Sequence, residues 1–185
     1  FELCKEEIML SRRHWSFLRT TNQFKTRVLH NCNTFDGNGT WAVASDAVTV
    51  ASDTGNFKEG TGSLSVNITV ATSADNFAVL QNTTMGAVDL NDFANNGYIR
   101  LWVFIPAILN FSNILIRFGS SSTDYWQSAI IERDVYGRGI HTGWNYLETK
   151  WEDAAITGSP DPQAVDFLYV RFTYAAGYTN QTGAR

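Results

Sequence analysis

Aromatic and basic residues alternate at two places in the sequence. Tyr98, Arg100 and Trp102 occupy every second position of one segment, and Tyr169 and Arg171 do the same in another. Side chains of a β-strand alternate between its two faces, so each set would lie on one face of a strand. An aromatic ring covers the apolar C–H face of a sugar, and a fixed polar group beside it orients the ligand. All five residues are therefore candidates for carbohydrate binding.

The same strand pattern has a second interpretation. One face of every strand in a packed sheet lies in the core. Trp102 and Phe104 would form that face if Leu101 and Val103 packed under a helix or a loop instead. The sequence leaves both placements of Trp102 open.

Residues that could catalyse a reaction do not occur in a recognisable pattern. The three histidines have no metal-binding spacing, and the sequence contains no nucleophile elbow and no phosphate-binding loop. A glycosidase needs two carboxylates that face each other across a cleft. Glu148, Glu152 and Asp153 are the candidates, but they do not alternate along one strand face, so we expect solvated charges there and no enzyme.

Charge and hydrophobicity exclude two further classes of partner. The 185 residues have a net charge of −4, which argues against non-specific binding to nucleic acid. The longest apolar run, 101–109, contains Pro106 and is much shorter than the roughly 20 residues that span a bilayer. We therefore expect no membrane span. Cys4 lies in the basic first segment and Cys32 just after it, so the large acidic part has no internal disulfide, and we expect both to be free thiols.

The first 30 residues differ from the rest of the chain. They carry a net charge of +3, against −7 for the remainder. Within residues 1–19, apolar side chains recur at helical spacing in two stripes, which include Ile8, Trp15, Phe17 and Leu18. The stripes span an arc of roughly 200°, wider than one packed side of a helix needs. The pattern predicts a first unit, residues 1–30, with an amphipathic helix and connector. The helix either packs as an ordinary element or contacts copies of this chain or other proteins.

From residue 31 onward the hydrophobic period changes from helical spacing to two. Alternation and turn residues predict about eight or nine short antiparallel strands at 41–50, 64–70, 77–81, 98–105, 114–118, 125–132, 144–151 and 166–174. No helical pattern of comparable strength lies among them. The expected fold is all-β, a jelly-roll β-sandwich over residues 31–185 that follows the N-terminal helix.

Several short motifs resemble carbohydrate-binding-module-like jelly rolls. The segments at 33–36 (NTFD) and 57–66 (FKEGTGSLSV) are similar to the opening of such domains, and 143–147 (GWNYL), 157–161 (TGSPD) and 164–168 (AVDFL) are similar to the last third. The resemblance covers about residues 33–175 and implies a structural calcium ion held by Asp36 and Glu59. One departure is that the family usually continues with an acidic strand, whereas this sequence stops at Arg185. Either that strand is absent or another segment replaces it.

The context of the domain follows from a second, shorter resemblance. Residues 13–19 (RHWSFLR) resemble an aromatic helix end of some phage neck and tail proteins, and residues 20–29 lead into the sandwich without a flexible Ser, Pro or Gly-rich linker. We therefore predict a non-catalytic structural or surface-binding component of a bacteriophage virion. Its partners would be other virion proteins or copies of itself, and a cell-surface glycan. The alternative is a carbohydrate-binding accessory module of a secreted polysaccharide-degrading enzyme.

Overall fold

The computed structural model describes residues 25–69, 76–94, 96–175 and 178–184. The described chain is built from strands and two short 3-10 helices, as the alternating hydrophobic pattern predicted. The elements are β1 (Trp41–Ser45), β2 (Ala47–Asp53), β3 (Ser63–Ile68), β4 (Phe77–Asn82), η1 (Asn91–Phe93), β5 (Tyr98–Ile105), β6 (Phe111–Gly119), β7 (Tyr125–Gln127), β8 (Gly143–Lys150), η2 (Trp151–Asp153), β9 (Ala155–Thr157), β10 (Phe167–Tyr174) and β11 (Gln181–Ala184).

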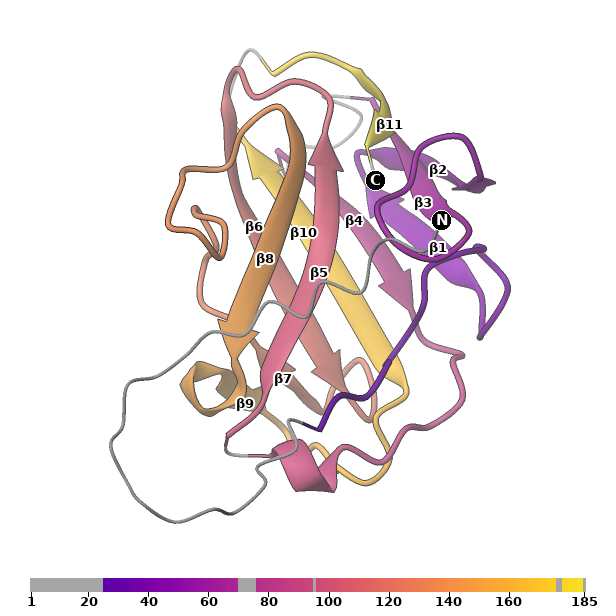
Figure 1. Cartoon of the computed structure of the whole chain (residues 1–185), viewed down its shortest axis with the longest axis vertical. Helices are drawn as coiled ribbons and strands as arrows, with labels where there is room; N and C mark the ends of the chain where they lie inside the picture. Colours follow the sequence, from indigo (N-terminus) through magenta and orange to yellow (C-terminus); the bar gives the residue numbers. More distant parts are fainter. Residues whose placement is uncertain (1–24, 70–75, 95, 176–177, 185) are drawn as a thin grey trace, which may run out of the picture.

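The strands form a sandwich of antiparallel sheets. One layer is a six-stranded sheet in the order β1-β4-β10-β6-β7-β9. The other layer contains the pair β5-β8 and the three-stranded sheet β11-β3-β2, and β11 lies next to β5. Figure 1 shows β5 and β8 in front of β6 and β10, with β2, β3 and β11 to one side. The predicted all-β sandwich is confirmed.

The core lies between the two layers. Ile114 and Ile116 of β6 and Phe172 of β10 pack there with Val103 of β5 and Leu147 of β8. All five side chains are at most 3% exposed, and each belongs to the inward set of its strand. A second cluster at one end joins Phe118, Trp126 and Trp151, whose rings lie 4.7 to 5.5 Å apart.

The predicted strand at 41–50 is two strands in the structure. Ser45 has a left-handed backbone conformation (φ 56°), which turns the chain out of the six-stranded sheet. The next residue, Asp46, is fully buried and accepts a hydrogen bond from the hydroxyl of Tyr174. After this turn β2 pairs with β3 in the other layer, so β1 and β2 close one edge of the sandwich.

The two ends of the chain bear differently on the predictions. The last strand of the described chain, β11, pairs with β3 and contains no acidic residue. Residues 1–24 lie outside the described residues, and so do the predicted helix and its contact residues Ile8, Trp15, Phe17 and Leu18. The unit at 1–30 therefore stays a prediction. No helix in the described ranges has the length and apolar character of a membrane span.

Cys32 is a half-buried free thiol, as the sequence predicted. Burial raises the pKa of this thiol to about 12, so it stays protonated and unreactive at neutral pH. Cys4 falls outside the described part of the chain.

Candidate functional site

The outward side of the β5-β8 pair carries five aromatic residues. We call this set the aromatic face; it comprises Tyr98, Trp102 and Phe104 of β5 and Trp144 and Tyr146 of β8. The antiparallel register places Trp102 opposite Tyr146 and Phe104 opposite Trp144. Every second residue of both strands points into the core, which turns the aromatic set away from it.

The rings of the aromatic face pack in pairs across the two strands. Trp102 and Tyr146 stack with centroids 4.6 Å apart and an interplanar angle of 22°. Phe104 and Trp144 meet edge to face at 5.4 Å. From Tyr98 to Phe104 the row extends about 20 Å at the usual rise of a strand. Tyr98 is 39% exposed, and the other four rings are half-buried. The result is an extended apolar strip and not an enclosed pocket.

Polar groups border the strip and fix its rings. Arg100 forms an ion pair of 2.7 Å with Glu148 on the neighbouring strand, and its guanidinium lies over the Tyr98 ring at 5.3 Å. The indole N–H of Trp102 donates to Glu59 at 2.8 Å, and Lys58 Nζ lies 5.0 Å from the Trp102 ring centroid. The connection between β2 and β3 therefore covers part of Trp102.

Burial is the main cause of a raised pKa for the Tyr146 hydroxyl, which is therefore neutral at physiological pH.

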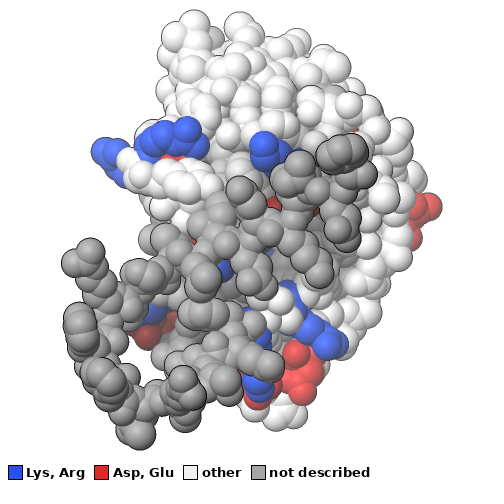
Figure 2. Space-filling view, viewed as in Figure 1, with Lys and Arg blue, Asp and Glu red and all other residues white. Residues whose placement is uncertain are grey.

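Charged side chains in the view of Figure 2 lie at the middle and lower end of the molecule. The end where β5 finishes and β6 begins shows none. The Phe104 and Trp144 end of the aromatic face thus adjoins uncharged surface.

The structure decides between the two sequence interpretations of Trp102. Val103 and Ile105 are the buried residues of β5, with Ile99 and Leu101 packed against the same core, whereas Trp102 points outward. The core placement of Trp102 is wrong. Its stacking partner, Tyr146, was not predicted as a site residue, and neither was Trp144. Their alternation at 144 and 146 was a usable signal, but only the register shows that they meet Trp102 and Phe104.

The five predicted carbohydrate-binding residues do not form one site. Tyr98, Arg100 and Trp102 lie together on the outward side of β5. Tyr169 and Arg171 lie on the outward side of β10, in the opposite layer of the sandwich. The core separates the two groups.

The proposed calcium ligands show no prearranged metal site. Asp36 and Glu59 are both exposed, and Glu59 is engaged by Trp102. Nearby, the amide oxygen of Asn33 accepts a hydrogen bond from the backbone N–H of Thr61 at 3.3 Å. Within the described ranges no three His, Cys, Asp or Glu side chains cluster as metal ligands would. The described geometry gives calcium no support, and calcium between Asp36 and Glu59 stays a prediction.

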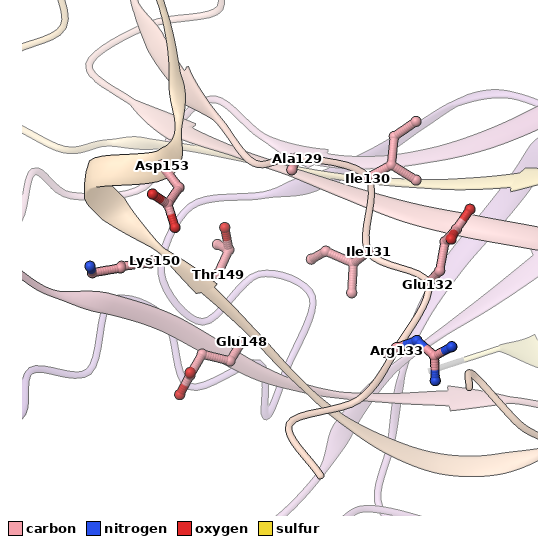
Figure 3. A pocket seen from close by; sticks show the side chains of 9 residues that line it. All are labelled: Ala129, Ile130, Ile131, Glu132, Arg133, Glu148, Thr149, Lys150 and Asp153. Atoms are coloured by element: carbon pink, nitrogen blue, oxygen red, sulfur yellow. The ribbon is translucent and has the colours of Figure 1, made fainter. Parts of the chain in front are cut away.

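Two of the three carboxylates considered for catalysis are engaged by neighbouring cations. Glu148 pairs with Arg100, and Glu152 pairs with Lys150. Figure 3 shows a pocket of about 350 Å³ between residues 129–133 and the end of β8, lined among others by Glu148, Lys150 and Asp153. Three charged side chains of the lining already bind other groups. Glu148 and Lys150 form the ion pairs just described, and Arg133 donates to the carbonyl of Gly137. The other two carboxylates of its lining, Glu132 and Asp153, take part in none of the ion pairs among the described residues, so the absence of catalysis stays a prediction.

Comparisons with known proteins show a similarity of fold and no sequence relative. No family model matches the sequence, and the search of curated proteins finds no match either. Among solved structures, the chain is similar to a family 30 carbohydrate-binding module, with a TM-score of 0.53 and 17% sequence identity over 79% of this chain and 86% of that chain. The protein thus has a β-sandwich of the carbohydrate-binding-module type. The predicted resemblance is confirmed at the level of the fold.

Proposed function

We propose that this protein is a non-catalytic carbohydrate-binding protein and that the aromatic face is its glycan-binding site. The observation that carries the proposal is the row of outward rings on β5 and β8, with Trp102 stacked on Tyr146. The similarity of the fold to a carbohydrate-binding module supports the same class of function.

The chemistry of the face favours a neutral, extended polysaccharide. Aromatic rings gain free energy by covering the apolar C–H faces of sugar rings, and a row of them contacts several sugars in succession. The one arginine of the row is neutralised by Glu148. A charged sugar would therefore gain little Coulomb energy here.

We further propose that the protein is a structural or surface-binding component of a bacteriophage virion, where it contacts other virion proteins or copies of itself. The sequence of residues 13–19, which resembles an aromatic helix end of some phage neck and tail proteins, and the lack of a Ser, Pro or Gly-rich linker in 20–29 support this context. The second candidate is a carbohydrate-binding accessory module of a secreted polysaccharide-degrading enzyme, and the fold similarity to a carbohydrate-binding module supports it.

The decisive variant for the glycan site is Trp102→Ala. Loss of one sugar-stacking ring removes contact worth on the order of 1 to 3 kcal/mol, so we expect roughly 5- to 150-fold weaker binding of a neutral glycan selected on a glycan array. Because Trp102 is half-buried and not in the core, the stability loss should be near the about 0.5–1.5 kcal/mol of an aromatic pair. Isothermal titration and thermal unfolding measure the two effects.

Tyr169→Ala is the matched control, since it removes an aromatic ring from the opposite layer. It should leave neutral-glycan binding unchanged. Equal loss in both variants, or unchanged binding in Trp102→Ala, would exclude the aromatic face as the site.

Calcium between Asp36 and Glu59 is tested separately. A bound ion would link the entry to β1 with the turn before β3, so a chelator should lower the melting temperature by binding linkage. Asp36→Asn should abolish the chelator effect. Identical melting curves with and without chelator would contradict calcium binding between Asp36 and Glu59.

A further inference from the structure

The outer side of the six-stranded sheet has a different chemistry from the aromatic face. Its strands contain two arginines, Arg117 and Arg171, and no acidic residue. The register sets Tyr169 of β10 opposite Arg117 of β6, and Thr173 opposite Asn113. We call these five outward residues the arginine face. Its positive charge contrasts with the net charge of −4 of the whole chain.

Neither arginine of this face has a carboxylate partner among the described residues. The Arg117 guanidinium lies between two tyrosine rings, 4.6 Å from the Tyr125 centroid and 4.7 Å from that of Tyr169. Its Nε donates to Gln127 at 2.8 Å. Arg171 lies over the Phe77 ring at 5.4 Å and takes part in no ion pair. The stacking holds both forks in place and leaves their charge uncompensated.

Three polar atoms of the arginine face have unmet hydrogen bonds. They are Arg171 Nε, Thr173 Oγ1 and Asn113 Oδ1, all buried and without a hydrogen-bond partner among the described residues. Asn113 is only 8% exposed. An unmet buried group is costly, so natural structures rarely keep one without a role. Because these three atoms are closed to solvent, direct contact with a ligand falls to the ends of the two half-buried guanidinium groups.

We infer that the arginine face binds a carboxylate-bearing polysaccharide, such as a uronic acid polymer. Arginine forks pair with carboxylates in two parallel hydrogen bonds, and a tyrosine beside them covers the apolar face of the sugar ring. This site is independent of the aromatic face, since it lies in the other layer of the sandwich. The protein would then hold a neutral and an acidic glycan on opposite sides.

The test compares polygalacturonate with its carboxyl-reduced form on the full chain. The two polymers share the backbone and differ in the carboxylate, so binding of the acidic form alone supports the inference. Arg171→Gln should weaken that binding about 10- to 100-fold, and added salt should weaken it in the parent protein. Equal affinity for both polymers would overturn the proposal.

Arg100→Gln is the matched control, because Arg100 lies on the aromatic face and is paired with Glu148. It should leave polygalacturonate binding unchanged, as should Trp102→Ala. If Arg171→Gln impairs folding, Arg171→Lys serves in its place. It keeps the positive charge but loses the two-pronged guanidinium, so it should bind polygalacturonate with intermediate affinity. A lysine variant that binds like the parent protein would contradict the bidentate contact, and equally tight binding of single-stranded DNA would show a general anion surface instead. Loss of neutral-glycan binding without loss of polygalacturonate binding would contradict the proposed function and not this inference.

Discussion

His30 connects the segment before β1 to the edge of the sandwich. Its Nδ1 accepts the backbone N–H of Cys32 at 2.9 Å, and its Nε2 lies 3.1 Å from the carbonyl of Asn38. The N–H of Cys32 requires an unprotonated Nδ1, so the neutral ring carries its proton on Nε2, which faces the carbonyl of Asn38. The indole N–H of Trp41 also lies 3.3 Å from Nε2. The Trp41 ring packs against the His30 ring edge to face at 5.1 Å. Protonation at Nδ1 would place two donors against each other.

Acid should therefore destabilise the fold through His30. Burial is the main cause that lowers the pKa of His30 below its usual 6.5, so the unfolded chain binds this proton more readily than the folded protein. The stability contributed by the neutral ring is present above pH 6.5 and is lost as the pH falls below it. Urea unfolding from pH 8 to 5 measures the slope. His30→Gln should flatten it at a cost of about 1 kcal/mol at pH 8, and an unchanged slope would assign the effect to other groups.

The alternating pattern located the longer strands but not their partners. The prediction for 98–105 coincides with β5, because four apolar residues alternate there with four outward residues without a break. The prediction of one strand at 41–50 was wrong at Ser45, because the left-handed conformation of this residue leaves no signal in a sequence that is compatible with a strand. β9 and β11 contain three and four residues, too few for a period to stand out. Only part of the candidate site could be predicted from the sequence. The alternating pattern indicated Trp102 as a site residue, but its contact with Tyr146 depends on the register of β5 and β8.

The turn between β6 and β7 depends on the absence of a side chain at Gly119. A Cβ there would lie 2.3 Å from the carbonyl oxygen of Asp124 and 2.5 Å from the Cα of Tyr125. Both are backbone atoms, so the strands must separate to admit a methyl group. Gly119→Ala should destabilise the protein by about 1–3 kcal/mol or more, measured by urea unfolding. Gly139→Ala is the control, since a Cβ at Gly139 meets nothing within 4 Å. Similar stabilities of the two variants would contradict this account of the turn.

At the scale of the whole molecule, one core supports two outer surfaces of different chemistry. The six-stranded sheet keeps all acidic residues out of its strands, while the β5-β8 pair neutralises Arg100 with Glu148. Strands of both layers supply core side chains within the described ranges, so we expect the sandwich to fold without the predicted N-terminal helix. Assembly and glycan binding can therefore be separated experimentally.

The predicted helix is tested by Trp15→Asp in the full chain. If residues 1–19 bury both apolar stripes, a carboxylate at position 15 should disrupt association with copies or partners, while the sandwich keeps its own core. Light scattering on the purified chain reports the oligomeric state, and thermal unfolding reports the fold. We expect a smaller particle with a melting temperature close to that of the parent protein. Virion components assemble in symmetric rings or trimers, whereas an accessory module is a monomer. A parent chain that is already monomeric favours the secreted module, and a variant that unfolds places the helix in the core of the sandwich instead.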